Sequence, residues 1–299
     1  MAADVRFSLR ALLAGSEITV LPGVYDGFSA RVVAAAGYPA AFVSGSGVSE
    51  SRLALPDRGY LSFPDVRDAV ASIAGAVPTA LLVDIDTGFG GALQVDRVVR
   101  EIEQLGAGGI VIEDQVAPKR CGYLPGRDVV SEEEMTEKIM AATAARRKAE
   151  FVIVARTDAY GSLGESAAVR RLQLYAAAGA DLVFPEGFAG AEEIQRVCRE
   201  SPVPVMLNDG LGLRARAEGA TARPSVRELA ALGVRVVLVP RLLSAAAVRG
   251  MRSAISAYAA ILDSECTVDQ PDLQVSFQDL LTLMGYEEAD EHRRFDRQV

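Results

Sequence analysis

The segment Lys119–Gly122 places a cysteine directly after two cations. Pro118 precedes the segment and Gly122 ends it, so Cys121 is expected on a loop. Nearby positive charge lowers the pKa of a thiol and makes its thiolate available. Cys121 is therefore a candidate acid or base, with Lys119 and Arg120 as the cations that tune it.

Carboxylates end the apolar runs that precede this loop. Glu113 and Asp114 lead directly into it, and Asp84 and Asp86 end an earlier apolar run. Mg²⁺ and Mn²⁺ prefer carboxylate ligands, and Mg²⁺ keeps several waters and accepts substrate oxygens. Arg156 ends a further run and could pair with a substrate carboxylate or phosphate. This set of residue types indicates a hard divalent cation beside an anionic oxyacid.

The chain has 299 residues, half of them hydrophobic, and a formal net charge of −9. A chain of this kind can bury one large core. Negative charge without a basic cluster argues against a nucleic acid or an anionic membrane as partner. The apolar runs are too short for a membrane span, and residues 1–13 lack a secretory signal. We therefore expect a cytoplasmic protein that acts on a small metabolite.

The chain has three widely spaced cysteines and a single histidine, His292, in the charged C-terminal tail. This cysteine spacing predicts neither a disulfide framework nor a zinc site. The position of His292 argues against a histidine triad or a histidine metal cluster. Any chemistry must use carboxylates, Cys, Tyr, Lys, Arg or a bound metal.

Short β-branched runs alternate with helical patterns along the chain, which is typical of βα units and a parallel sheet. The predicted strands are Ile18–Leu21, Ala41–Ser44, Ala80–Asp84, Gly109–Glu113, Phe151–Arg156, Leu182–Phe184, Val205–Leu207 and Val236–Val239. The segments AAAGYPAAFVSG, QLGAGGIVIED, AAAGADLVFPEG and AALGVRVVLVP share one form, in which a glycine ends a helix before a strand. The pattern predicts an α/β protein with a (β/α)₈ TIM barrel.

We expect residues 1–250 to form the barrel and residues 251–299 a C-terminal helical extension. The extension carries apolar residues that need burial, namely Phe277, Leu280, Leu281 and Met284. They could pack on the same barrel or across a subunit interface.

In such a barrel the active site lies at the carboxyl ends of the strands. The polar residues expected there are Tyr25, Asp26, Ser44, Asp84, Asp86, Glu113, Asp114, Arg156, Asp158, Glu186, Asn208, Asp209 and Arg241. Strand ends also become polar because they reach water, so each residue alone decides little. The small residues of SGSGVSES, after the second strand, offer backbone N–H groups to an anion but do not complete a dinucleotide fingerprint.

Several of these segments together resemble the isocitrate lyase and phosphoenolpyruvate mutase superfamily. They are PGVYDGFSARV, the SGSG segment, LPDRG, DIDTGFGG, IEDQVAPKRCG, ARTDAY and the strand that ends at Glu186. The similarity is greatest to its short branch, with 2-methylisocitrate lyase, 2,3-dimethylmalate lyase and carboxyphosphonoenolpyruvate phosphonomutase. It extends from about Val20 to Asn208 and is weaker in the last third of the chain.

The resemblance implies a Mg²⁺-dependent (β/α)₈ barrel, commonly a homotetramer with C-terminal helices exchanged between neighbours. It implies that Asp84 holds Mg²⁺ directly or through water. The other implied roles are a metal shell of Asp57, Asp86 and Glu113, a carboxylate site of Ser44, Gly45 and Ser46, pocket positions Arg156, Glu186 and Asn208, and Cys121 as the acid or base of a lyase. Tyr25 is a candidate acceptor of the hydroxyl proton.

Two departures from the family pattern bear on the substrate. Tyr123 stands where the lyases usually have histidine, and it cannot become a cation near neutral pH. NDGLGLR, which starts at Asn208, replaces the segment that holds the distal carboxylate of tricarboxylates. A 2-hydroxydicarboxylate is therefore expected, cleaved to pyruvate or another 2-oxo acid.

Two other functions remain open at this point. One is phosphorus–carbon chemistry or decarboxylation on a 2-oxo acid, as in phosphonomutases, phosphonopyruvate hydrolases and oxaloacetate decarboxylases. The other is a keto-acid-binding barrel without activity. The presence of Cys121 favours the lyase.

Overall fold

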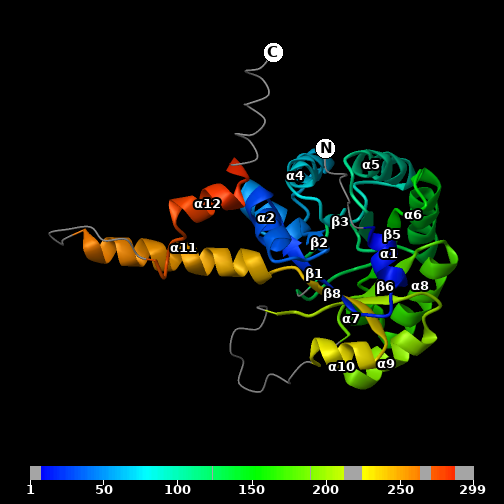
Figure 1. Cartoon of the computed structure of the whole chain (residues 1–299). Helices are drawn as coiled ribbons and strands as arrows, with labels where there is room; N and C mark the ends of the chain where they lie inside the picture. Colours follow the sequence, from blue (N-terminus) through cyan, green and yellow to red (C-terminus); the bar gives the residue numbers. More distant parts are fainter. Residues whose placement is uncertain (1–7, 123, 189, 212–223, 263–270, 287–299) are drawn as a thin grey trace, which may run out of the picture.

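The computed structural model describes residues 8–122, 124–188, 190–211, 224–262 and 271–286. Eight parallel strands form a closed barrel in sequence order, and the last pairs with the first (Figure 1). The strands are β1 (Thr19–Val24), β2 (Ala40–Val43), β3 (Ala80–Asp84), β4 (Gly109–Glu113), β5 (Val152–Thr157), β6 (Leu182–Pro185), β7 (Val205–Asn208) and β8 (Val234–Val239). The predicted α/β class and barrel are confirmed.

Helices surround the barrel and follow most strands (Figure 1). They are α1 (Leu9–Ala14), α2 (Gly27–Ala35), α3 (Gly45–Val48), the π-helical turn η1 (Ser49–Leu53), α4 (Phe63–Ala76), α5 (Ala92–Gln104), α6 (Glu132–Ala145), α7 (Tyr160–Leu163), α8 (Glu165–Ala177), α9 (Ala191–Glu200), α10 (Val226–Ala231), α11 (Leu242–Ile261) and α12 (Phe277–Leu283). No helix of the described residues is both long and apolar enough to cross a membrane.

Every predicted strand corresponds to an observed one, with bounds that agree within two residues except at β1, which ends three residues later than predicted. The predicted strand ends at Leu21, before Pro22 and Gly23, yet the backbone continues as a strand to Val24. Gly23 is needed because a Cβ there would lie 2.1 Å from the carbonyl oxygen of Pro240, which follows β8. A close approach of two backbones therefore explains a glycine that the sequence alone makes look like a strand end.

The four repeated segments end their helices as expected. Gly37, Gly106, Gly179 and Gly233 have φ values of +80°, +91°, +107° and +100°. Only glycine adopts this conformation without strain, and it turns the chain from each helix into the next strand.

The core has two layers, separated by the barrel wall. Alternate strand residues such as Phe42, Leu82 and Met206 fill the barrel interior, where they are joined by Leu9 of α1. Their neighbours along each strand, such as Val83 and Leu207, pack outward against the helices. This alternation decides which polar residues at the strand ends point into the barrel.

The C-terminal helix α11 projects away from the barrel, and α12 returns to lie beside α2 (Figure 1). The Arg31 guanidinium of α2 donates a hydrogen bond of 3.1 Å to the carbonyl oxygen of Leu283. Within the described part of the chain, no residue of α11 is buried, and Ile255 is 72% exposed. An apolar surface of this kind is typical of an interface.

Candidate active site

Strand parity brings the candidate residues of five strands together inside the barrel. Asp84 lies two residues after the interior residue Leu82, and Asn208 lies two residues after Met206. By the same rule Ser44, Glu113 and Arg156 each lie two residues after an interior residue of β2, β4 and β5. All five therefore point into the mouth of the barrel.

Four of these side chains line one cavity, and Glu113 lies 3.3 Å from Arg156, one of the lining residues. The lining residues are Phe42, Ser44, Ser46, Asp57, Asp84, Lys119, Cys121, Gly122, Arg156, Phe184, Glu186, Asn208, Leu238, Pro240 and Arg241. The cavity thus joins most of the residues singled out in the sequence.

Asp84 at the end of β3 is held by backbone amides. The N–H of Gly45 donates to its Oδ2 at 3.3 Å, and the N–H of Asp86 donates to its Oδ1 at 3.1 Å. A Cβ at Gly45 would lie 2.9 Å from the same Oδ2, so only glycine leaves the carboxylate in place. Beside it, the hydroxyls of Ser44 and Ser46 are 3.0 Å apart and share a hydrogen bond.

Lys119 lies among the carboxylates and does not reach toward solvent. Its ammonium forms ion pairs with Asp57 and, at 2.9 Å, with Oδ1 of Asp86. Burial alone would lower the pKa of Lys119, but the carboxylates around it, Asp86 and Glu113 foremost, raise it well above its usual value. Lys119 is therefore a fixed cation that compensates acidic side chains.

Two buried carboxylates in this group have raised pKa values. Burial raises the pKa of Asp86 to about 6 although Lys119 opposes the shift, and the charges of Asp84 and Asp57 add to it. Burial also raises the pKa of Glu113 well above its ordinary value, against the effect of Arg156. Oε1 of Glu113 has no hydrogen-bond partner among the described residues. Such an uncompensated buried oxygen suits a cation or a cation-bound water.

Arg156 is surrounded by three carboxylates. Its Nε and Nη2 donate to Asp158 at 2.8 and 2.9 Å. Nε also lies 3.3 Å from Glu113, and Nη2 lies 3.6 Å from Glu186. The guanidinium packs over the ring of Phe184, 5.2 Å from its centroid. Arg156 is therefore held rigidly at the cavity wall.

The loop after β4 brings Cys121 to this cavity. The side chain of Gln115 braces the loop, because it exchanges two hydrogen bonds of 2.9 Å with the backbone of Arg120. The Arg120 guanidinium lies 3.5 Å from the carbonyl oxygen of Pro125, within the loop. A Cβ at Gly122 would lie 2.4 Å from Nη2 of Arg156, so the loop backbone lies directly against the site.

The cations next to Cys121 in sequence thus have other partners, and Arg241 comes to the cavity from the end of β8. Its guanidinium donates a hydrogen bond of 2.8 Å to Glu50 in η1. Burial lowers the pKa of Arg241, but Glu50, Cys121 and Asp57 together raise it above its usual value. Its place at a strand end was the only sequence signal for Arg241.

Three predicted features lie elsewhere or outside the described residues. Tyr25 does not line the cavity, and its ring lies against Gly47 of α3. Burial and the charge of Asp26 raise the pKa of its hydroxyl. Tyr123 lies outside the described residues, as do residues 212–223, which include the last three residues of the NDGLGLR segment.

Asp114 has a different role from that of its neighbour Glu113, because strand parity turns it outward. It is fully buried and accepts hydrogen bonds from Thr157 at 2.7 Å, from Tyr175 at 2.7 Å and from Arg171 at 3.1 Å. The backbone N–H of Asp158 donates a further one at 2.9 Å. Asp114 therefore fixes the ends of β4 and β5 to α8.

Replacing Asp114 with alanine is expected to lower the free energy of unfolding by about 3–5 kcal/mol, because Arg171 is left buried without its charge partner. Urea denaturation at a fixed protein concentration measures the change. Asp96→Ala is the control, because Asp96 pairs with Arg100 on the surface of α5. Equal effects of the two substitutions would contradict the role assigned to Asp114.

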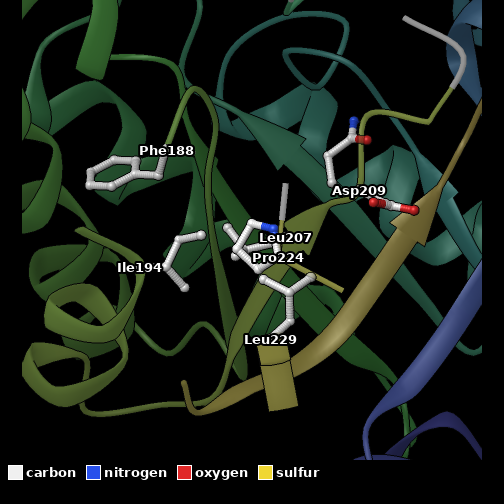
Figure 2. Close-up of a pocket in the computed structure, with 7 residues that line it drawn as sticks. Phe188, Ile194, Leu207, Asp209, Pro224 and Leu229 are labelled. Atoms are coloured by element: carbon white, nitrogen blue, oxygen red, sulfur yellow. The ribbon is translucent and has the colours of Figure 1, made fainter. Parts of the chain in front are cut away.

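A second pocket lies outside the barrel wall, between β7, α9 and α10. Figure 2 shows its lining of Phe188, Ile194, Leu207, Pro224 and Leu229, with Asp209 at one side. Most of these side chains are apolar, and they include no group suited to proton transfer except Asp209. The chemistry therefore belongs to the cavity inside the barrel, which this pocket adjoins at Asn208.

Comparison with known proteins shows the family to which the chain belongs. Residues 9–259 match the family model described as phosphoenolpyruvate phosphomutase. The 2-methylisocitrate lyase of Aeropyrum pernix is 36% identical over 94% of this chain and 89% of its own length. The 2,3-dimethylmalate lyase of Eubacterium barkeri is 36% identical over 95% of each chain.

Solved structures show the same fold and ligands of the expected kind. An oxaloacetate acetylhydrolase in complex with 3,3-difluorooxalacetate superposes with a TM-score of 0.86, at 32% identity over 97% of this chain and 96% of the other. A phosphonopyruvate hydrolase in complex with oxalate and Mg²⁺ superposes with a TM-score of 0.77, at 29% identity over 95% and 96%. The chain belongs to the phosphoenolpyruvate mutase and isocitrate lyase superfamily.

Proposed function

We propose that this protein is a Mg²⁺-dependent lyase that cleaves a carbon–carbon bond of a 2-hydroxydicarboxylate. The products are pyruvate or another 2-oxo acid and a second carboxylic acid. The observation that carries the proposal is the meeting of Cys121, a group of buried carboxylates and Arg156 in one cavity. The similarity to 2-methylisocitrate lyase and 2,3-dimethylmalate lyase supports it.

The carboxylates fit a magnesium ion held partly through water. Asp84 is the proposed principal ligand, with Asp57, Asp86 and Glu113 around it. The described residues contain no group of three acidic, Cys or His side chains already arranged to hold a metal, and Mg²⁺ in proteins usually keeps several of its waters. Mn²⁺ has similar preferences and could replace Mg²⁺. When bound, the ion would lower the pKa of the substrate hydroxyl and stabilise negative charge on its oxygens.

The substrate end that becomes the 2-oxo acid belongs near β2. Ser44, Gly45 and Ser46 offer hydroxyl and backbone donors to its carboxylate. Arg156 lies opposite, and Glu186 and Asn208 complete the wall. These positions hold the bond to be broken close to the Cys121 loop.

Cys121 is the proposed general acid for the other product. Cleavage moves the electron pair of the C2–C3 bond onto C3, while the C2 oxygen becomes the carbonyl oxygen of the 2-oxo acid. The thiol of Cys121 gives its proton to C3 and becomes a thiolate. The hydroxyl proton leaves to solvent, since Tyr25 does not line the cavity, and a proton from solvent returns to the thiolate. Condensation is the reverse sequence.

The exposed apolar residues of α11 and α12 support an oligomer. Ile255 and Phe277 are 72% and 75% exposed, and a second copy of the chain would cover them. We propose a homotetramer in which these helices are exchanged between neighbours, which light scattering and crosslinking would test.

The affinity for Mg²⁺ is expected to fall as the pH drops below about 6, the pKa of Asp86. Above this pKa Asp86 is ionised and can bind a cation. Below it Asp86 is protonated, and the proton must be lost before Mg²⁺ binds. The loss should approach about tenfold for each further pH unit. Calorimetric titration with Mg²⁺ measures it, and Asp86→Asn should bind more weakly and with a flatter pH dependence. An unchanged affinity down to pH about 5 would remove Asp86 from the metal site.

The function is tested by 2-oxo acid release from purified protein with Mg²⁺. Pyruvate can be coupled to lactate dehydrogenase, and the substrates should include malates, alkylmalates, methylisocitrate, oxaloacetate and phosphonopyruvate. Metal-dependent release from a hydroxy acid would support the lyase. Release from oxaloacetate or phosphonopyruvate alone would favour 2-oxo acid chemistry, for which the similarity to the oxaloacetate acetylhydrolase is the supporting observation.

A further inference from the structure

Three cations line the cavity, and two of them are already compensated by buried carboxylates. Lys119 contacts Asp57 and Asp86. Arg156 contacts Asp158, Glu113 and Glu186. Neither brings excess positive charge to a substrate, so the substrate carboxylate that lies away from the proposed Mg²⁺ needs another cation.

Arg241 differs from the other two cations. Among the described residues it donates one hydrogen bond, from Nη1 to Glu50, so Nε and Nη2 keep donors for a ligand. The side chains of Arg241 and Glu50 are 27% and 35% exposed, so water also screens the charge of Glu50. The pair fixes the guanidinium at the cavity wall without using up its donors.

The proposed reaction determines where a second anion site must lie. After the C2–C3 bond breaks, the negative charge on C3 spreads into the carboxylate attached to that carbon. Cys121 protonates C3, so this distal carboxylate must lie within a few bonds of the thiol. A cation beside Cys121 would stabilise both the bound carboxylate and the charge that develops on it.

We propose that Arg241 binds the distal carboxylate of the substrate and thereby selects dicarboxylates. The inference rests on the proposed function, because it names the residue that binds one end of the proposed substrate in the same cavity. Arg241 and Cys121 line the same cavity, whereas Arg120 next to Cys121 contacts the carbonyl oxygen of Pro125 in its own loop. In the described part of the chain, the other two cations that line the cavity, Lys119 and Arg156, are already paired with buried carboxylates.

A purely structural role for Arg241 is the competing explanation. In that case its pair with Glu50 would only join the end of β8 to η1. Half-exposed ion pairs contribute little to stability, so the structural role alone would leave ligand affinity nearly unchanged. Ligand binding therefore separates the two explanations.

Two probes of different length test the proposal in the presence of Mg²⁺. Oxalate spans only the metal end of the cavity, whereas succinate has a second carboxylate at a distance. Arg241→Leu is expected to weaken succinate binding about 10- to 100-fold and to change oxalate binding less than about twofold. Arg241→Lys keeps the charge and should restore part of the succinate affinity.

Arg97→Leu is the matched control, because Arg97 also pairs with a glutamate, Glu101, but on the surface of α5. It should leave both affinities unchanged. Equal affinities of wild type and Arg241→Leu for succinate would overturn the proposal, as would an equal loss for both probes. These outcomes do not depend on turnover. An Arg241-dependent succinate site in a protein that cleaves no hydroxy acid would retain the inference and reject the lyase.

Discussion

Replacing Cys121 with alanine should slow the cleavage of a hydroxydicarboxylate about 1,000-fold or more at saturating substrate, because the carbanion at C3 loses its proton donor. The Mg²⁺-dependent affinity for oxalate should stay within about twofold of the wild type, since the metal carboxylates do not contact the loop thiol in the proposed mechanism. Steady-state kinetics and calorimetry measure the two quantities.

Cys198→Ala provides the matched control for this substitution. Cys198 lies on α9, and burial raises the pKa of its thiol to about 11. Its removal should leave turnover unchanged, which would show that the loss of a thiol elsewhere in the protein does not by itself lower the turnover rate. If Cys121→Ala retained the wild-type rate, the thiol would have no part in proton transfer.

Replacing Asp84 with asparagine should weaken Mg²⁺ binding and lower kcat/KM by at least about 100-fold. The amide has the same shape as the carboxylate and keeps one oxygen, which can accept from the N–H of either Gly45 or Asp86, so the fold is expected to survive. The variant removes the negative charge that the ion requires. Magnesium titration followed by calorimetry, together with the coupled assay, measures both effects.

Asp96→Asn is the comparison for Asp84→Asn, because its carboxylate pairs with Arg100 on the surface of α5. The comparison variant should bind Mg²⁺ and turn over as the wild type does. Full Mg²⁺ affinity in Asp84→Asn would mean that the ion binds elsewhere, and the carboxylates around Lys119 would then need another explanation.

Strand parity explains why so much of the site could be predicted from the sequence. A βα repeat fixes where each strand ends, and the two-residue period places Asp84, Glu113 and Arg156 inside the barrel. The repeat also predicted the glycines that end the helices, such as Gly106. Local patterns carry this information, so no tertiary contact had to be known.

Partners across the barrel could not be predicted in the same way. Lys119 and Arg120 are next to Cys121 in sequence, yet Lys119 pairs with Asp57 and Asp86. Arg241 is far away in sequence but lines the same cavity as Cys121. Such pairings depend on how a long loop folds over the strand ends, and neither propensity nor periodicity determines that path.

The bounds of β1 show the same limit at a single position. The predicted strand ends at Leu21, but the observed strand continues to Val24, with Pro22 paired to Val239 and Gly23 against Pro240. The partner residue comes from the opposite end of the barrel sequence. Only the closed sheet reveals why the glycine is there.

The central claim is tested most directly by following cleavage of an alkylmalate in D₂O by NMR and mass spectrometry. The proposed mechanism predicts equal amounts of a 2-oxo acid and a carboxylic acid with one deuterium on the carbon next to its carboxylate. The reaction should stop when EDTA removes Mg²⁺. Carbon dioxide as the product, or no cleavage of any hydroxy acid with Mg²⁺ present, would contradict a carbon–carbon lyase of 2-hydroxydicarboxylates.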